Sequence, residues 1–193
     1  MNSPAPLVLA SSSPYRAELL RRLGVPFETV VSGIDETRRD GETADALVRR
    51  LARGKAEHVA ALRPDAAVIG ADQVAVCGER ILGKPGEREH AIERLREMSG
   101  RTVEFLSGIA FIHAGRTEVD VVPTRLTLRE LGDDEIARYV DRDEPFDCAG
   151  GMRSESLGIA LLSSLTSDDP TALIGLPLIR VSSWLRAAGH DVP

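Results

Sequence analysis

One carboxylate stands inside a run of apolar residues. Residues 66–76 read Ala-Ala-Val-Ile-Gly-Ala-Asp-Gln-Val-Ala-Val, and the charged residue among them is Asp72. The run predicts a strand covered on both faces, because apolar and polar residues hardly alternate in it. A carboxylate in such a strand is costly unless a cation, a hydrogen bond or a metal ion compensates for its lost hydration. Asp72 is therefore the strongest functional candidate in the chain, and a hydrogen bond to a neighbouring loop is the structural alternative.

A candidate anion site lies near the N-terminus, where residues 7–16 read Leu-Val-Leu-Ala-Ser-Ser-Ser-Pro-Tyr-Arg. The four apolar residues predict a short buried strand, and Pro14 predicts the start of a helix with Ser13 as its N-cap. The free N–H groups of that helix, its dipole and the Arg16 guanidinium would stabilise an anion such as phosphate. Taken alone, the stretch is better explained as an ordinary strand-to-helix turn with a surface arginine.

Two lysines could supply further positive charge. Lys55 belongs to a helix that we predict from its N-cap Thr43 up to residues 63–64, and it lies near the edge of the helix's buried face. A solvated surface position is the commoner outcome for a single lysine. Lys84 stands between Gly83 and Pro85, and the tight turn positions it better than a free surface would.

The segment that contains Lys84 has the spacing of a phosphate-binding P-loop up to its last position. There Pro85 replaces the required Ser or Thr, which removes a metal-binding hydroxyl and a backbone N–H. The next helical pattern also begins only near Arg88, whereas a P-loop helix begins at the lysine. We therefore reject a P-loop.

Two polar loops carry further candidates. Residues 32–36 predict a polar turn with two adjacent carboxylates, Asp35 and Glu36. Residues 147–155 combine a double glycine with charged and hydroxyl side chains up to Glu155, and could bring backbone and side chains to a ligand. A plain loop is about as good an explanation of the second segment.

The alternation of strand and helix patterns up to Met98, followed by a hairpin, predicts an α/β fold with a long mixed sheet flanked by helices. The length of 193 residues suits one domain, and we see no linker or repeat. Trp184 is expected in the core. Beyond the segments above, we predict strands at 25–31, 102–112, 117–128 and 158–165, and helices at 89–98, after a cap at Asp133, and from Pro177 onward.

The bulk properties exclude several classes of function. A formal net charge of −6 argues against broad binding to nucleic acid or acidic membranes, but it permits a local basic pocket. Cys77 and Cys148 match no zinc pattern or disulfide framework, so we expect reduced thiols and a cytoplasmic protein. No apolar stretch of the sequence approaches membrane-spanning length, and the N-terminus does not read as a signal peptide.

Seven motifs in order along the chain resemble those of the Maf-type nucleoside triphosphate pyrophosphatases. The resemblance extends from Leu7 to about Leu185. The motifs are Leu9-Ala10-Ser11-Ser12-Ser13-Pro14-Tyr15-Arg16, Asp35-Glu36, Lys55-Ala56, Gly70-Ala71-Asp72-Gln73, Gly83-Lys84-Pro85, Cys148-Ala149-Gly150 and Gly175-Leu176-Pro177.

This resemblance implies two lobes around a nucleotide-binding cleft, a homodimer, and hydrolysis between the α and β phosphates of a nucleotide with Mg²⁺ or Mn²⁺ present. It assigns Asp72 as general base and metal ligand, with Glu36 as a second ligand. Ser11 and Arg16 would hold phosphate, and the lysines Lys55 and Lys84 would neutralise the triphosphate during catalysis. Phosphoryl transfer needs such charge neutralisation and positioning more than covalent help.

Three positions resemble the 7-methyl-GTP pyrophosphatase subgroup of this family, namely Tyr15, Gln73 and Glu155. Guanine methylated at N7 is positively charged, so an aromatic face and a carboxylate would attract it, whereas an arginine in place of Tyr15 would repel it. We expect removal of diphosphate from 7-methyl-GTP, in a role that disposes of modified nucleotides. The alternatives are the dTTP/UTP-hydrolysing branch and a nucleotide-binding regulator of septum formation.

Overall fold

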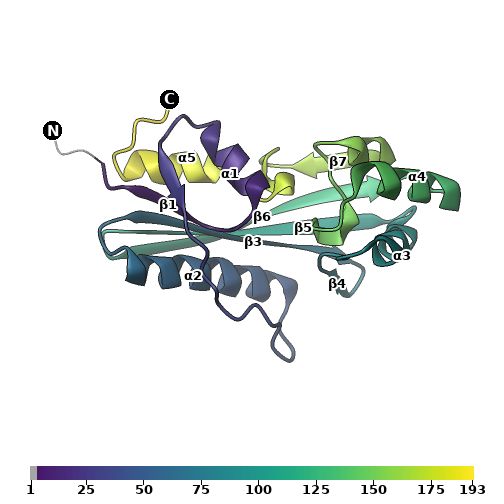
Figure 1. Cartoon of the computed structure of the whole chain (residues 1–193), viewed down its shortest axis with the longest axis horizontal. Helices are drawn as coiled ribbons and strands as arrows, with labels where there is room; N and C mark the ends of the chain where they lie inside the picture. The colour runs from purple at the N-terminus through teal and green to yellow at the C-terminus, as the bar shows by residue number, and fades with distance from the viewer. Residues whose placement is uncertain (1–3) are drawn as a thin grey trace. The chain divides into compact units, whose positions relative to one another are not determined.

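The computed structural model describes residues 4–193 (Figure 1). Seven strands form one mixed sheet in the order β2-β1-β3-β5-β6-β7, with β4 paired to β3. This confirms the predicted α/β class. The strands are β1 (Leu7–Ala10), β2 (Phe27–Thr29), β3 (Ala67–Cys77), β4 (Arg80–Leu82), β5 (Thr102–His113), β6 (Arg116–Leu128) and β7 (Leu162–Ser167). The helices are α1 (Pro14–Arg21), α2 (Ala44–Leu62), α3 (Arg88–Met98), α4 (Asp133–Asp143) and α5 (Leu178–Ala187).

The chain divides into two compact units. The described part of unit 1 comprises residues 4–72, 107–122 and 169–193, and unit 2 comprises residues 73–106 and 123–168. Strands β3, β5 and β6 contribute residues to both units.

In unit 1 the central strands are covered on both faces. Strand β1 runs parallel to β2 and to β3, with Leu7 opposite Ala67 and Ala10 opposite Gly70. Leu7 and Leu9 pack with side chains of α1 and α5, whereas Val8 packs with side chains of α2. Figure 1 shows α1 and α5 on one side of these strands and α2 on the other. This explains why the sequence of β3 does not alternate.

Helix α2 lies very close to the sheet of unit 1. A Cβ atom at Gly70 of β3 would be 2.1 Å from the carbonyl oxygen of Ala52, and one at Gly108 of β5 would be 2.5 Å from that of Val48. No larger residue fits at these positions without moving the helix. The two glycines thus set how deeply the next turn of α2, which carries Lys55, approaches β3.

The C-terminal helix of unit 1 supplies the tryptophan. Trp184 is 6% exposed and lies against Phe111, with ring centroids 6.0 Å apart. The prediction that this residue belongs to the core is confirmed.

In unit 2, α3 packs against α4 and against the short 3-10 turn Ala149–Gly151. Strand β4 pairs antiparallel with β3, and β7 pairs antiparallel with β6. The loop between β4 and α3 is fixed by two backbone hydrogen bonds: Gly150 N–H donates to Gly83 O (3.2 Å), and Gly86 N–H donates to Phe146 O (2.9 Å). This loop carries Lys84.

Two local predictions in unit 2 are wrong. Asp133 does not cap α4: Gly132 is the cap, because the Asp133 carboxylate pairs with Arg96 at 2.7 Å instead. Residues 158–165 are not one strand, since Leu157–Leu161 form a 3-10 turn and β7 begins at Leu162. The Gly158 N–H donates to Arg153 O (3.0 Å), which folds this segment back on itself.

Most of the remaining elements agree closely with the predicted ones. Ser13 and Thr43 cap α1 and α2 as predicted, accepting from the N–H groups of Arg16 and Ala46. The hairpin β5–β6 and helices α3 and α5 lie within a few residues of the predicted ranges. Strand β2 is shorter than predicted, and β4 was not predicted. Helix α3 begins at Arg88, so no helix starts at Lys84, as the rejection of a P-loop requires.

Candidate functional site

The centre of the site is a buried ion pair within unit 1. Lys55 Nζ lies 2.7 Å from Asp72 Oδ1, and the two side chains are only 8% and 10% exposed. Asp72 therefore has the cationic partner that a carboxylate in this strand requires. The solvated position considered for Lys55 is wrong, because its turn of α2 packs directly on β3.

Lys55 also contacts a second carboxylate. Its Nζ lies 2.9 Å from Glu36 Oε1, in the loop that leads from β2 to α2. The Glu36 side chain is 56% exposed. The ammonium thus joins a buried carboxylate on the sheet to one that faces solvent, and this places both acidic side chains around a single cation.

The predicted anion-binding turn lies between β1 and α1. Arg16 Nη1 donates to Ser11 Oγ (3.4 Å), and its Nε donates to the carbonyl oxygen of Gly175 (3.0 Å). The Ser13 N–H also donates to Ser11 Oγ (3.1 Å). Arg16 is partly buried and Ser11 is buried. The turn is therefore preorganised by its own side chains, with the guanidinium held in one orientation.

The electrostatics connect this turn to the ion pair. Burial lowers the pKa of Arg16 from its ordinary value, and the negative charges of Asp72 and Glu36 act in the opposite direction and raise it. An arginine remains protonated at physiological pH under such shifts. Unit 1 therefore brings together Ser11, Arg16, Glu36, Lys55 and Asp72, which makes one cluster of two cations, two carboxylates and a hydroxyl. Tyr15, one residue before Arg16, is partly exposed.

The other predicted site residues belong to unit 2. Lys84 and Glu155 are exposed, and Gln73 directly follows Asp72 in β3. The segment of Glu155 is anchored on both sides, because Arg153 N–H donates to Tyr139 Oη (2.9 Å) and Ser156 Oγ donates to Asp143 Oδ1. The joint action of these residues with the cluster of unit 1 stays a prediction.

The acidic side chains of the site suit a divalent cation that is bound jointly by protein carboxylates and substrate phosphates. Within residues 4–193, no group of three or more His, Cys, Asp or Glu side chains gathers as a metal site. Glu36 and Asp72 do offer two carboxylates beside one ammonium. Mg²⁺ is commonly held by one or two carboxylates and completes its octahedron with waters and substrate phosphates. The donor set therefore suits a cation that arrives with a nucleotide.

Comparison with known proteins agrees with this arrangement of motifs. The family model described as Maf-like protein matches residues 6–188. The chain belongs to the Maf family. A protein of Alkalilimnicola ehrlichii named 7-methyl-GTP pyrophosphatase is 52% identical over 97% of this chain and 95% of its own length. Proteins of the same name from Nitrosococcus oceani and Pseudomonas putida are 52% and 51% identical, over 98% and 97% of this chain and 98% and 99% of their own lengths.

Two features of this Maf chain were not found from its sequence. The first is the hydrogen bond by which the Gly175 carbonyl fixes Arg16, 159 residues away in sequence. The motif of residues 175–177 was recognised in the sequence, but nothing in it indicated this contact. A group of arginines around α2 lines a separate pocket, described below. The crowding of arginines at residues 49, 50 and 53 was the available signal. None of the helices within residues 4–193 has the length and apolar character of a membrane-spanning segment.

Proposed function

We propose that this Maf-family chain is a nucleoside triphosphate pyrophosphatase, a hydrolase acting on acid anhydrides, that converts 7-methyl-GTP to 7-methyl-GMP and diphosphate. The choice of 7-methyl-GTP as substrate is supported by relatives that are 48–52% identical and are named 7-methyl-GTP pyrophosphatase. The observation that carries the chemistry is the buried contact of 2.7 Å between Lys55 Nζ and Asp72 Oδ1 in the unit that also holds Arg16. A binding protein has no need of such a water-activating carboxylate.

Asp72 acts as the general base in this proposal. Its Oδ1 is occupied by Lys55, so Oδ2 is the atom that we assign to accept the proton of the attacking water. The water oxygen bonds to the α phosphorus, the bond from that phosphorus to the bridging oxygen breaks, and diphosphate leaves with the bonding electrons. Lys55 keeps the carboxylate in one orientation throughout.

The phosphates are held by the groups that the cluster already orients. Ser11 and Arg16 bind phosphate oxygens, and Lys55 and Lys84 offset the charge of the triphosphate. Glu36 and Asp72 would hold Mg²⁺ or Mn²⁺, which would neutralise phosphate charge when bound. Tyr15 stacks on the charged methylated base, and Gln73 and Glu155 contact its edge.

We also propose that the chain works in the cytoplasm as a homodimer, with no nucleic-acid or membrane partner. The charge of −6 supports the absence of broad polyanion binding, and the unpaired thiols Cys77 and Cys148 support a reducing compartment. Size-exclusion chromatography with light scattering measures the oligomeric state, and a monomer at micromolar concentration would contradict the dimer.

The decisive experiment measures diphosphate release from 7-methyl-GTP, GTP, dTTP and UTP with Mg²⁺ or Mn²⁺. We expect the highest kcat/KM with 7-methyl-GTP. Asp72→Asn should lower kcat by on the order of 10²-fold or more, as expected for loss of a positioned general base. The matched control is Asp65→Asn, at an exposed aspartate in the turn before β3.

Three outcomes would contradict parts of this proposal. Equal or better turnover of dTTP and UTP would assign the chain to the other substrate branch. No hydrolysis of any nucleotide would favour a binding regulator. Full activity of Asp72→Asn in a folded protein would remove Asp72 from the general-base role.

A further inference from the structure

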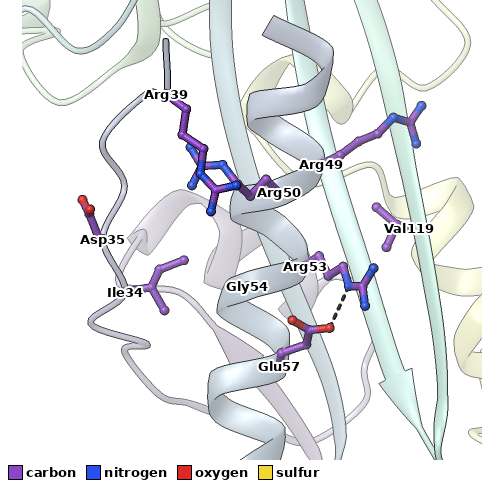
Figure 2. Close-up of a pocket in the computed structure, with 9 residues that line it drawn as sticks. All are labelled: Ile34, Asp35, Arg39, Arg49, Arg50, Arg53, Gly54, Glu57 and Val119. Carbon is purple, nitrogen blue, oxygen red and sulfur yellow. Dashed lines mark hydrogen bonds and ion pairs between the residues drawn. The ribbon is translucent and has the colours of Figure 1, made fainter. Parts of the chain in front are cut away.

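A second cationic site is lined by α2, by the loop before it and by Val119 of β6, all within unit 1. This pocket, which we call the arginine groove, has a volume of about 730 Å³ and is shown in Figure 2. Four arginines and two carboxylates line it, in a chain whose net charge is −6. Its lining residues are Ile34, Asp35, Arg39, Arg49, Arg50, Arg53, Gly54, Glu57 and Val119.

One of these arginines has a structural task. Arg50 Nε and Nη2 contact the two oxygens of Glu42 at 2.6 and 2.8 Å, and Nη2 also donates to Thr37 O (3.0 Å). The Arg50 guanidinium lowers the pKa of Glu42 to about 2. Arg50 thus fixes the loop before α2 and is not available to a ligand.

Arg49 and Arg53 are held much more weakly. Each pairs with an exposed carboxylate of its own helix, Arg49 with Asp45 and Arg53 with Glu57, both at 2.7 Å. The four side chains are 42–59% exposed, and ion pairs of this kind are worth little in water. Figure 2 shows both arginines extending from α2 on the side of Val119. An anion that offers better geometry can replace these carboxylates at little cost.

The chemistry of these arginines selects the ligand. A guanidinium is planar and binds two phosphate oxygens at once, and residues four apart on a helix are neighbours on its surface. A diphosphate group offers two adjacent anionic centres, one for each guanidinium. Arg39, on the loop side of the groove, adds a third positive charge. We propose that the arginine groove binds a diphosphate group, either free inorganic diphosphate or the phosphate tail of a nucleotide.

The groove and the Lys55 cluster are built from consecutive residues of the same two segments. Asp35 and Gly54 line the groove, and the next residues along the chain, Glu36 and Lys55, form one of the two ion pairs of the cluster. A Cβ at Gly54 would be 3.2 Å from Ile34 Cδ1, so the loop rests directly on the helix here. The binding itself does not depend on the proposed function. Only the statement that inorganic diphosphate is a product of this chain rests on the proposed function.

The test is a titration followed by the ¹H–¹⁵N NMR signals of arginine Nε groups, with no metal and no turnover. Inorganic diphosphate, GDP, phosphate and sulfate are added separately, and Arg49→Lys and Arg53→Lys assign the two groove signals. We expect saturable shifts of both signals with diphosphate or with GDP. If only one of these two ligands acts, it identifies the source of the diphosphate group.

A double variant tests whether Arg49 and Arg53 contribute to the affinity of the groove. Arg49→Gln/Arg53→Gln should weaken binding at the groove by about tenfold or more, because two charge-assisted contacts are lost. Its groove occupancy is read from the Nε signal of Arg39. Arg21→Gln should leave the affinity unchanged, because Arg21 is also an exposed arginine paired within its own helix, with Glu18 at 2.9 Å.

The outcomes separate this proposal from the proposed function. Shifts of Arg16 without shifts of Arg49 and Arg53 would overturn the groove site and leave the catalytic assignment standing. Shifts of the two groove arginines in a protein that hydrolyses no nucleotide would support the groove and overturn the function. Equal shifts with sulfate or single phosphate at the same concentration would overturn the preference for diphosphate.

Discussion

The two lysines of this chain have opposite surroundings, and they are the only lysines among its 24 basic Lys and Arg residues. Lys55 is buried between Asp72 and Glu36 on a helix packed against the sheet of unit 1. Lys84 is exposed on a loop of unit 2 whose backbone is fixed by hydrogen bonds to Gly150, Phe146 and the His90 ring. Lys55 is therefore part of the folded core as well as of the site, whereas the Lys84 side chain extends into solvent, where a ligand can reach it.

This comparison predicts the largest effect for Lys55→Gln. The change leaves Asp72 buried without its cation, which costs about 3–5 kcal/mol of folding free energy, and it removes a charge from the site. Urea denaturation followed by Trp184 fluorescence measures the stability. Diphosphate release measures the activity at a temperature where the variant is folded. An unchanged denaturation midpoint would show that the Lys55–Asp72 pair is not what stabilises this part of the core.

The next effect concerns the surface on which Lys55 rests. Gly70→Ala places a Cβ 2.1 Å from the carbonyl oxygen of Ala52, so α2 must move away from β3. We expect a loss of about 1–3 kcal/mol from overpacking, together with lower activity because Lys55 and Asp72 separate. The control is Gly83→Ala, where a Cβ meets nothing within 4 Å. Wild-type stability and activity of Gly70→Ala would mean that α2 tolerates the shift.

The same two regions show how far the sequence predicts this molecule. The caps Ser13 and Thr43 and the burial of strand β3 can be predicted from local sequence, because neighbouring residues give the signal for each. That Asp72 needs a partner also follows from its sequence. That the partner is Lys55 does not, because it depends on how closely α2 approaches Gly70.

Long-range contacts explain the failures as well. Asp133 pairs with Arg96, which is 37 residues away in sequence, and this contact takes the place of the capping role that aspartate commonly has. The Gly175 carbonyl that orients Arg16 is still more remote, at 159 residues along the chain. The family motifs predicted the members of the cluster in unit 1, and the structure supplied their contacts.

Lys84→Gln tests the exposed lysine of unit 2. Because Lys84 is exposed, the substitution should change the free energy of unfolding by no more than about 0.5 kcal/mol. Loss of a charged contact to the triphosphate should raise KM by about tenfold, with a smaller change in kcat. Steady-state kinetics and urea denaturation on the same preparation separate the two quantities. A large loss of stability with unchanged KM would reverse the roles assigned to the two lysines.

The last prediction concerns neither stability nor turnover and tests how closely the loop beside Lys84 is packed. Cys148 precedes the 3-10 turn that is bonded to Gly83, and burial, with Asp147 adding to it, raises the pKa of its thiol to about 12. Alkylation requires the thiolate, and the pKa of a free cysteine thiol is about 8.5. Iodoacetamide at pH 8 should therefore react at least about 10²-fold more slowly with the folded protein than with the unfolded one. Mass spectrometry of Cys77→Ser, which leaves Cys148 alone, measures this rate. Rapid alkylation of the folded variant would show that the loop opens, and that Lys84 is held even less firmly than its backbone contacts indicate.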